Sequence, residues 1–273
     1  MRVAVVGGTG RVGRPLVEAL RRGGHDVVVA ARSTGADVVT GRGLDGALRG
    51  CAAVVDASGP SWLSTRRARD LEGFFAAAAD RVGDAAARGG AQHLVVLSAV
   101  GVDRLSGPPL LAGKRAQEER ARRAPLRTTV VRATPPHEAG ADVAALTREG
   151  DGAVVPPLLV QPLAVADLAA ELARVAVGPP RGLLEVAGPR TEDLVDMARR
   201  TLSARREPLE LRELARHALR RRGRRRGHAA RPRRRPDAHD LRQLAARRLG
   251  AGVSGPPVAQ PVRPTRPDLR RTP

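Results

Sequence analysis

An apolar run that ends in regularly spaced glycines constrains the fold of this chain more than any other feature. Val3–Val6 lead into Gly7, and Gly10 and Gly13 follow at three-residue intervals. A segment of helical periodicity over 11–22 begins within this loop. A strand, a tight turn and a helix in this order begin a parallel α/β sheet. Gly7 permits a turn that a Cβ atom would block, Gly10 lets the backbone approach a phosphate, and Gly13 lets the helix pack closely on the strand.

The same turn predicts a binding site for a diphosphate. The first N–H groups of a helix have no partner within the helix, and the helix dipole adds positive charge there. The loop therefore predicts a dinucleotide site whose contacts are Gly7, Thr9, Gly10, Arg11, Val12 and Gly13. The spacing is one residue wider than the G-x-G-x-x-G fingerprint. The alternative is a loop that only shapes the turn.

The end of the second predicted strand bears on which dinucleotide binds. This strand covers 27–31, and Arg32 follows it. An acidic residue here would bind a ribose hydroxyl and favour NAD, whereas a guanidinium pairs with a 2′-phosphate. Arg32 therefore favours NADP(H). NAD stays an alternative, because Arg32 is one of 47 arginines in the chain.

Strand and helix patterns alternate over the first 204 residues. Apolar runs predict strands at 3–6, 27–31, 52–57, 94–98, 128–132 and 183–186, and helical spacing predicts helices at 11–22, 44–49, 65–88, 113–123, 165–177 and 191–202, the last capped by Thr191. A further helix at 142–148 and short extended pieces at 154–155 and 158–160 lie between them. The pattern predicts an α/β fold: a Rossmann-type, doubly wound parallel sheet over 1–204, with a small C-terminal substrate-side region.

Composition narrows the class of protein. Trp62, Phe74 and Phe75 are the only aromatic residues, so the core must consist of Val, Leu and Ala, as in buried parallel strands. Cys51 is the single cysteine, which excludes an intrachain disulfide and a cysteine-based metal cluster. No apolar stretch reaches the ~18 residues that span a bilayer. We therefore expect a cytoplasmic protein that does not enter a membrane.

Several motifs together resemble the atypical short-chain dehydrogenase/reductases, in the NmrA-like or NAD(P)H-binding group. The resemblance covers about residues 1–204. Its segments are the glycine loop at 7–13, Ala53-Val-Val-Asp-Ala-Ser58, His93-Leu-Val-Val-Leu-Ser-Ala-Val-Gly-Val-Asp103, Lys114-Arg-Ala-Gln-Glu118, Val131-Arg-Ala-Thr134 and Gln161-Pro-Leu-Ala-Val-Ala-Asp167. The resemblance implies that Ala57 and Ser58, at the end of the third strand, lie against the cofactor.

In catalytically active relatives a serine, a tyrosine and a lysine cooperate. The resemblance assigns Ser98 to the serine and Lys114, the only lysine of the chain, to the lysine that also contacts the cofactor. Leu110 stands where the tyrosine would be, and the chain contains no tyrosine. The usual general acid is therefore missing. Two functions stay open: an oxidoreductase acting on a small carbonyl or quinone-like substrate, and a non-catalytic NADP(H)-binding sensor or scaffold.

The segment Thr134-Pro135-Pro136-His137-Glu138 departs from the family pattern. Relatives tend to carry a polar and an aromatic residue where the two prolines stand, in a part of the chain that walls the substrate site. His137 and Glu138 are weak candidates for acid–base chemistry. They form no zinc motif, because Ala141 occupies the position of the second histidine. We predict no metal site, and a small molecule as the substrate; the sequence specifies no oligomeric state.

Residues 205–273 differ from the rest of the chain. They carry 21 basic and 6 acidic side chains, against 27 and 22 in residues 1–204. Six of the seven residues Arg220–Arg226 are arginine, and 253–273 are rich in proline and arginine. Such a composition predicts a largely disordered basic tail.

Three origins of this tail stay open. An out-of-frame tail is favoured, since Asp240–Ala246 can be encoded by GAC CTT CGG CAG CTG GCT GC, and the frame one base later reads Thr-Phe-Gly-Ser-Trp-Leu, similar to the C-terminal ending of family members. A native disordered tail is the second. Nucleic-acid binding is the third; the charge permits it, but no aromatic residue follows Phe75 to stack on bases, and no DNA-binding motif occurs.

Overall fold

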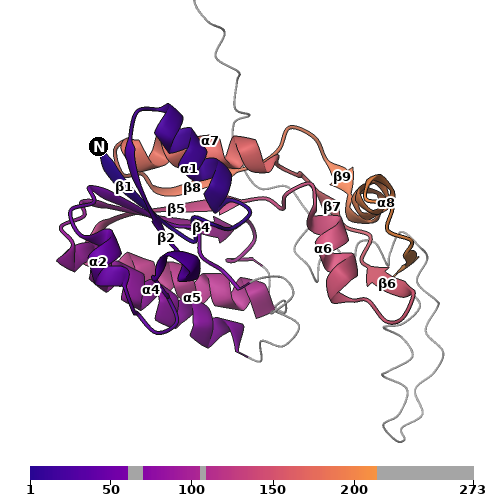
Figure 1. The fold of residues 1–273 in the computed structure, drawn as a ribbon. Coiled ribbons are helices and arrows are strands. Elements are labelled where there is room, and N and C mark those ends of the chain that lie inside the picture. Colours follow the sequence, from indigo (N-terminus) through magenta and orange to yellow (C-terminus); the bar gives the residue numbers. More distant parts are fainter. Residues whose placement is uncertain (61–69, 105–108, 214–273) are drawn as a thin grey trace, which may run out of the picture.

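The computed structural model of the chain describes residues 1–60, 70–104 and 109–213. Its centre is a six-stranded sheet in which every neighbouring pair of strands is parallel, in the order β2-β1-β3-β4-β5-β8 (Figure 1). The strands are β1 (Arg2–Val6), β2 (Asp26–Ala30), β3 (Ala53–Asp56), β4 (His93–Ala99), β5 (Arg127–Ala133) and β8 (Gly182–Val186). This topology confirms the predicted doubly wound, Rossmann-type sheet.

Helices cover both faces of the sheet (Figure 1). On one face lie α1 (Gly13–Arg22) and α7 (Val165–Val177), and on the other lie α2 (Leu44–Leu48), α4 (Leu71–Arg88) and α5 (Pro109–Arg123). Successive strand residues alternate between the two layers: Val3 and Val5 of β1 join one apolar cluster, and Ala4 joins the other. Because both faces are buried, the strands read as continuous apolar runs.

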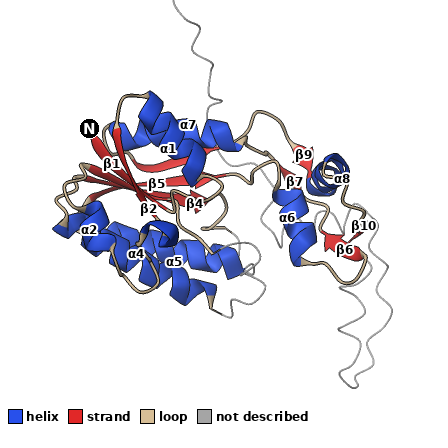
Figure 2. Ribbon diagram, viewed as in Figure 1, coloured by secondary structure: helices blue, strands red, loops and turns tan. Residues whose placement is uncertain are grey.

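A smaller unit stands beside the sheet (Figure 2). It consists of α6 (Ala139–Leu146), β6 (Gly152–Val155), β7 (Leu159–Val160), β9 (Glu192–Asp193), α8 (Leu194–Ala204) and β10 (Glu210–Glu213). Here β6 pairs with β10 in parallel and β7 with β9 in antiparallel orientation. This second unit has an apolar cluster of its own, centred on Ala144, Val155 and Met197. It is the small C-terminal region that the sequence predicted.

Three backbone segments connect the sheet to the second unit and pack against one another. The amide of Leu163 donates to the carbonyl of Pro135 at 3.0 Å, and the amide of Gly188 donates to the carbonyl of Gln161 at 3.3 Å. A Cβ atom on Gly188 would lie 1.7 Å from the carbonyl oxygen of Pro162. The joint therefore has no room for a side chain at that position.

Two predictions about the second unit were wrong. Helix α8 is capped by Asp193, which accepts hydrogen bonds from the amides of Val195 and Asp196, and not by Thr191. The reason is that Glu192–Asp193 form β9 and pair with β7, so the helix cannot begin earlier. In addition, β10 lies in a segment where the sequence pattern predicted no element. The rest of the predicted tail, 214–273, lies outside the described residues. Among the helices of the described residues, none is long and apolar enough to cross a membrane.

Candidate functional site

The glycine loop packs backbone against backbone at the carboxyl ends of β1 and β3. Gly7 has φ of +77°, and a Cβ atom there would lie 2.8 Å from the carbonyl oxygen of Ala57. A Cβ atom on Gly13 would lie 2.1 Å from the carbonyl oxygen of Gly7. Both positions therefore require glycine. At Gly7 the reason is the tight turn that the sequence suggested, whereas at Gly13 the close contact is with the loop backbone and not with the strand. By contrast, a Cβ on Gly10 meets only the Gly7 carbonyl oxygen, at 3.1 Å.

Helix α1 begins with unpaired amides. The amide of Gly10 donates to Gly7 at 2.9 Å and that of Arg14 donates to Gly10 at 3.0 Å. Among the residues that the structure describes, the amides of Arg11, Val12 and Gly13 have no acceptor. Three free N–H groups at the positive end of a helix are suited to bind an anionic diphosphate.

The side chain of Arg11 extends from this loop to the second unit. Its guanidinium makes a bidentate ion pair with Asp142 of α6, in which Nη2 lies 2.9 Å from Oδ1 and Nη1 donates to Oδ2. This hydrogen bonding raises the pKa of Arg11. Arg11 was a predicted cofactor contact; the carboxylate that already neutralises it was not predicted, because the two residues lie 131 positions apart.

Arg32 lies next to the loop and is free. It follows β2 in a short helical turn, Arg32–Thr34, and its side chain is exposed. The amide of Gly7 donates to the carbonyl of Ala30 at 2.8 Å, which brings the end of β2 beside the glycine loop. No hydrogen bond or ion pair holds the side chain of Arg32 within the described part of the chain. Its guanidinium is thus available for a 2′-phosphate.

Two buried hydroxyls at the same edge of the sheet lack partners. Ser58 follows β3 and Thr134 follows β5, and neither hydroxyl has a hydrogen-bond partner among the described residues. An unsatisfied buried hydroxyl costs ~1–3 kcal/mol. Both hydroxyls lie at the carboxyl ends of the strands, where a doubly wound parallel sheet binds its ligand. The free amides and these hydroxyls therefore fit a dinucleotide.

Lys114 also lies at this edge of the sheet. From α5 its amine donates to the carbonyl of Leu97 on β4 at 2.8 Å and to Oε1 of Gln117 at 2.9 Å, and it lies 4.4 Å from the centre of the Phe75 ring. Burial lowers the pKa of Lys114 to about 8, although the carboxylates of Asp56 and Glu118 oppose this shift. A lysine with this pKa releases and regains a proton near neutral pH.

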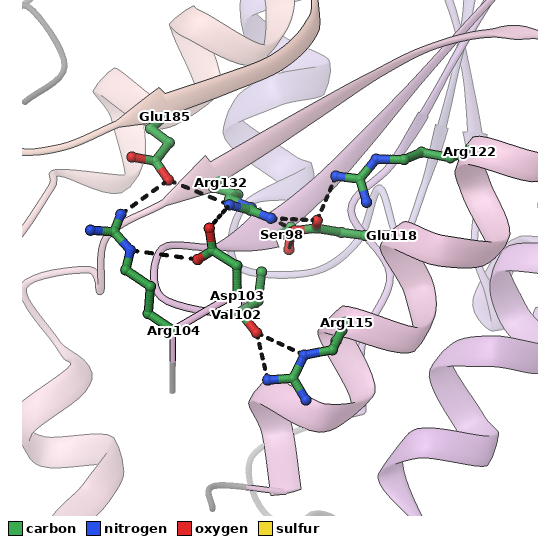
Figure 3. Close-up of polar contacts among 9 residues, drawn as sticks. All are labelled: Ser98, Val102, Asp103, Arg104, Arg115, Glu118, Arg122, Arg132 and Glu185. Carbon is green, nitrogen blue, oxygen red and sulfur yellow. Dashed lines mark hydrogen bonds and ion pairs between the residues drawn. The ribbon is translucent and has the colours of Figure 1, made fainter. Parts of the chain in front are cut away.

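Ser98 belongs to a different cluster (Figure 3). Its hydroxyl donates to Glu118 at 2.6 Å, and Glu118 makes two hydrogen bonds of 2.9 Å with Arg132 of β5. Burial raises the pKa of Glu118, but the hydrogen bonds from Arg132, Ser98 and Arg122 outweigh it and lower the pKa. The structure thus does not join Ser98 to Lys114, since their polar groups have separate partners.

The position of the missing tyrosine is filled by an aliphatic side chain. Leu110 is half-buried in the first turn of α5, one turn before Lys114 on the same side of the helix. His137 is exposed, and its ring nitrogen lies 3.9 Å from Glu192. Near the start of α6, Oε2 of Glu138 is buried without a partner among the described residues.

Sequence reasoning missed four charged or polar residues that hold this site together. Gln117 and Glu118 lie inside the Lys114–Glu118 motif, so the motif contained a signal that was not used. Asp56 ends the apolar run of β3, where a buried carboxylate is unusual. Only Asp142 had no local signal.

Comparison with known proteins agrees with this geometry. A family model described as NAD(P)H-binding matches residues 7–174. No curated protein matches the sequence. Similar solved structures include UDP-glucose 4-epimerase of Thermus thermophilus in complex with NAD, with 17% identity, a TM-score of 0.61, and coverage of 78% of this chain and 86% of that one.

Two further structures show the same fold. Triphenylmethane reductase of Citrobacter sp., complexed with NADP(H), has 17% identity and a TM-score of 0.59 over 78% of this chain and 79% of that one. A short-chain dehydrogenase/reductase superfamily protein from Agrobacterium tumefaciens, with bound NAD, has 18% identity and a TM-score of 0.57 over 78% and 85%. At these identities the likeness concerns the fold alone.

Proposed function

The chain belongs to the NAD(P)H-binding family, and on this premise we propose that it binds NADP(H) and acts as an oxidoreductase on a small carbonyl or quinone-like compound. The observation that carries the proposal is the glycine loop, where the amides of Arg11, Val12 and Gly13 are unpaired at the start of α1. The diphosphate would bind to these amides. The adjoining unpartnered hydroxyls of Ser58 and Thr134 support a polar ligand along the same edge.

A preference for NADP(H) over NAD(H) is supported by Arg32. Its free guanidinium follows β2, where the 2′-position of an adenosine ribose would lie. Replacing Arg32 by alanine should weaken NADPH binding about tenfold and leave NADH binding nearly unchanged, since a charged hydrogen bond contributes ~1.5 kcal/mol. Arg49→Ala is the matched control, because Arg49 is another exposed arginine, at the end of α2.

Lys114 has the central chemical role in this proposal. A bound nicotinamide supplies the hydride, and the Lys114 amine would hold the nicotinamide ribose and exchange the proton that accompanies reduction of a carbonyl. Its pKa of about 8 allows both protonation states near neutral pH. Ser98 is the second candidate, although its hydroxyl already donates a hydrogen bond to Glu118.

A non-catalytic NADP(H) sensor is the second candidate function. Leu110 favours it, since a leucine side chain has no proton to transfer. The two candidates are separated by titrating NADPH and NADH into the purified protein by fluorescence or calorimetry, followed by turnover assays with carbonyl and quinone compounds. Turnover that Lys114→Ala abolishes supports the enzyme, and tight NADPH binding without turnover supports the sensor.

The binding half of the proposal has its own test. The double variant Gly10→Val, Gly13→Val brings Cβ atoms within 3.1 Å and 2.1 Å of the Gly7 carbonyl oxygen, and so displaces the loop whose amides would hold the diphosphate. It should bind no measurable NADPH. Binding equal to that of the parent would overturn the proposed function as a whole.

A further inference from the structure

Gln117 is a fully buried amide that joins two charged groups. It lies on α5 three residues after Lys114 and is 0% exposed. Its carbonyl oxygen accepts from the Lys114 amine at 2.9 Å, and its nitrogen donates to Oδ2 of Asp56 at 2.8 Å. Both ends of the amide are therefore used, and their orientation is fixed, because only the NH₂ end donates.

Asp56 connects this amide to the carboxyl end of β3, where the cofactor is proposed to bind. The residue ends β3 and is 1% exposed. Its second oxygen, Oδ1, accepts from the amide of Ser58 at 2.9 Å. One buried carboxylate thus fixes the turn that carries Ala57 and Ser58 and, through Gln117, the amine of Lys114.

We propose that Gln117 is a positioning residue, which holds the Lys114 amine at the carboxyl end of β4 and separates it from Asp56 by one uncharged group. A direct ion pair between Lys114 and Asp56 would keep the lysine permanently charged. The amide of Gln117 holds the Lys114 amine and the Asp56 carboxylate in place through one hydrogen bond to each. Because the two charges are not in direct contact, burial can favour the neutral form of the amine. The charged groups that act on Lys114 are Asp56 of β3 and Glu118 of α5.

The consequence for the cofactor rests on the proposed function. If the Lys114 amine contacts the nicotinamide ribose, loss of Gln117 should weaken NADPH binding by misplacing the amine. The effect of Gln117 on the pKa of Lys114 requires no cofactor, so it is measured separately.

The test uses the fact that Lys114 is the only lysine in the chain. Protein labelled with ¹³C-lysine gives one Cε signal, whose chemical shift against pH reports the titration of this amine directly. Gln117→Met keeps the volume and removes both hydrogen bonds, so the pKa should fall by about one unit. Gln117→Glu adds a carboxylate at the same place and should raise it by about one unit or more. Gln92→Met is the control, because Gln92 is exposed and distant from the site.

Opposite shifts in the two Gln117 variants, with no shift in the control, establish the positioning role. Titrations of Lys114 that coincide with the control overturn it, even if the variants are less stable. A merely structural glutamine would not shift the pKa of Lys114 in opposite directions in the two variants. Should Gln117→Met fail to fold, Asp56→Asn replaces it, since losing that charge also lowers the pKa. In cofactor titrations, Gln117→Met should bind NADPH about tenfold more weakly. If the parent binds no NADPH, the proposed function fails while the titrations still decide the role of Gln117.

Discussion

Gly13→Ala tests the packing of the glycine loop with a single methyl group. The added Cβ would lie 2.1 Å from the carbonyl oxygen of Gly7, 2.7 Å from Cα of Gly8 and 2.9 Å from the carbonyl carbon of Gly7. All three are backbone atoms, so no side chain can rotate away. A carbon normally approaches a carbonyl oxygen to ~3.3 Å. The loop must therefore move by about 1 Å relative to α1.

The expected cost follows from this displacement. Overpacking of this kind destabilises a protein by ~1–3 kcal/mol. For a domain of this size, 2 kcal/mol corresponds to a decrease in melting temperature of about 4–8 °C. The same shift misaligns the free amides of Arg11 and Val12, and loss of ~1.4 kcal/mol of diphosphate binding weakens NADPH affinity tenfold. Thermal unfolding and calorimetric titration measure the two effects.

Gly46→Ala is the matched control for this experiment. Gly46 lies inside α2, and a Cβ atom there would meet nothing within 4 Å. Because alanine is a better helix former than glycine, this variant should be more stable by ~0.5–1 kcal/mol. The reasoning is refuted if Gly13→Ala has the same melting temperature as Gly46→Ala and binds NADPH as tightly as the parent.

Three further predictions concern charged and titratable groups. Burial lowers the pKa of His93, so the unfolded chain binds its proton more tightly, and the free energy of unfolding should fall as pH drops below ~6.5; urea midpoints at pH 7.5 and 5.5 should differ less in His93→Gln. Glu118→Gln leaves the buried guanidinium of Arg132 without its main partner and should cost ~3–5 kcal/mol in chemical denaturation, whereas the exposed neighbour Glu119→Gln should have no effect. Asp142→Asn removes the carboxylate that neutralises its arginine partner in the glycine loop, so NADPH should bind up to about fivefold more tightly, the equivalent of ~1 kcal/mol; unchanged or weaker binding would contradict this.

The central sheet was predictable because its signals are local. Each strand is an apolar run of a few residues, and both of its faces are covered, so no partner needs to be known to recognise it. Gly7 and Gly13 were predictable from the spacing of the glycines. The contact that excludes a Cβ at Gly13 is with the neighbouring loop backbone, whereas the contact at Gly7 is with Ala57, at the end of β3. The structure confirms the fold class, and the family match confirms that the chain belongs to the NAD(P)H-binding family.

The second unit was harder to predict because its contacts are not local. Strand β10 forms against β6, about sixty residues earlier, and its own sequence has no strand pattern. Asp193 caps α8 only because β9 pairs with β7. The Gln117–Asp56 hydrogen bond joins positions 61 residues apart. The direction of Ser98 follows from strand alternation, which turns its hydroxyl toward Glu118 on α5.

The joint between the sheet and the second unit restricts how the substrate side can open. Because three crossing segments lie against one another, and Gly188 packs on the carbonyl of Pro162, the second unit cannot tumble as a body tethered by a single linker would. Its movement relative to the sheet is limited by these three segments and by the ion pair between Arg11 and Asp142.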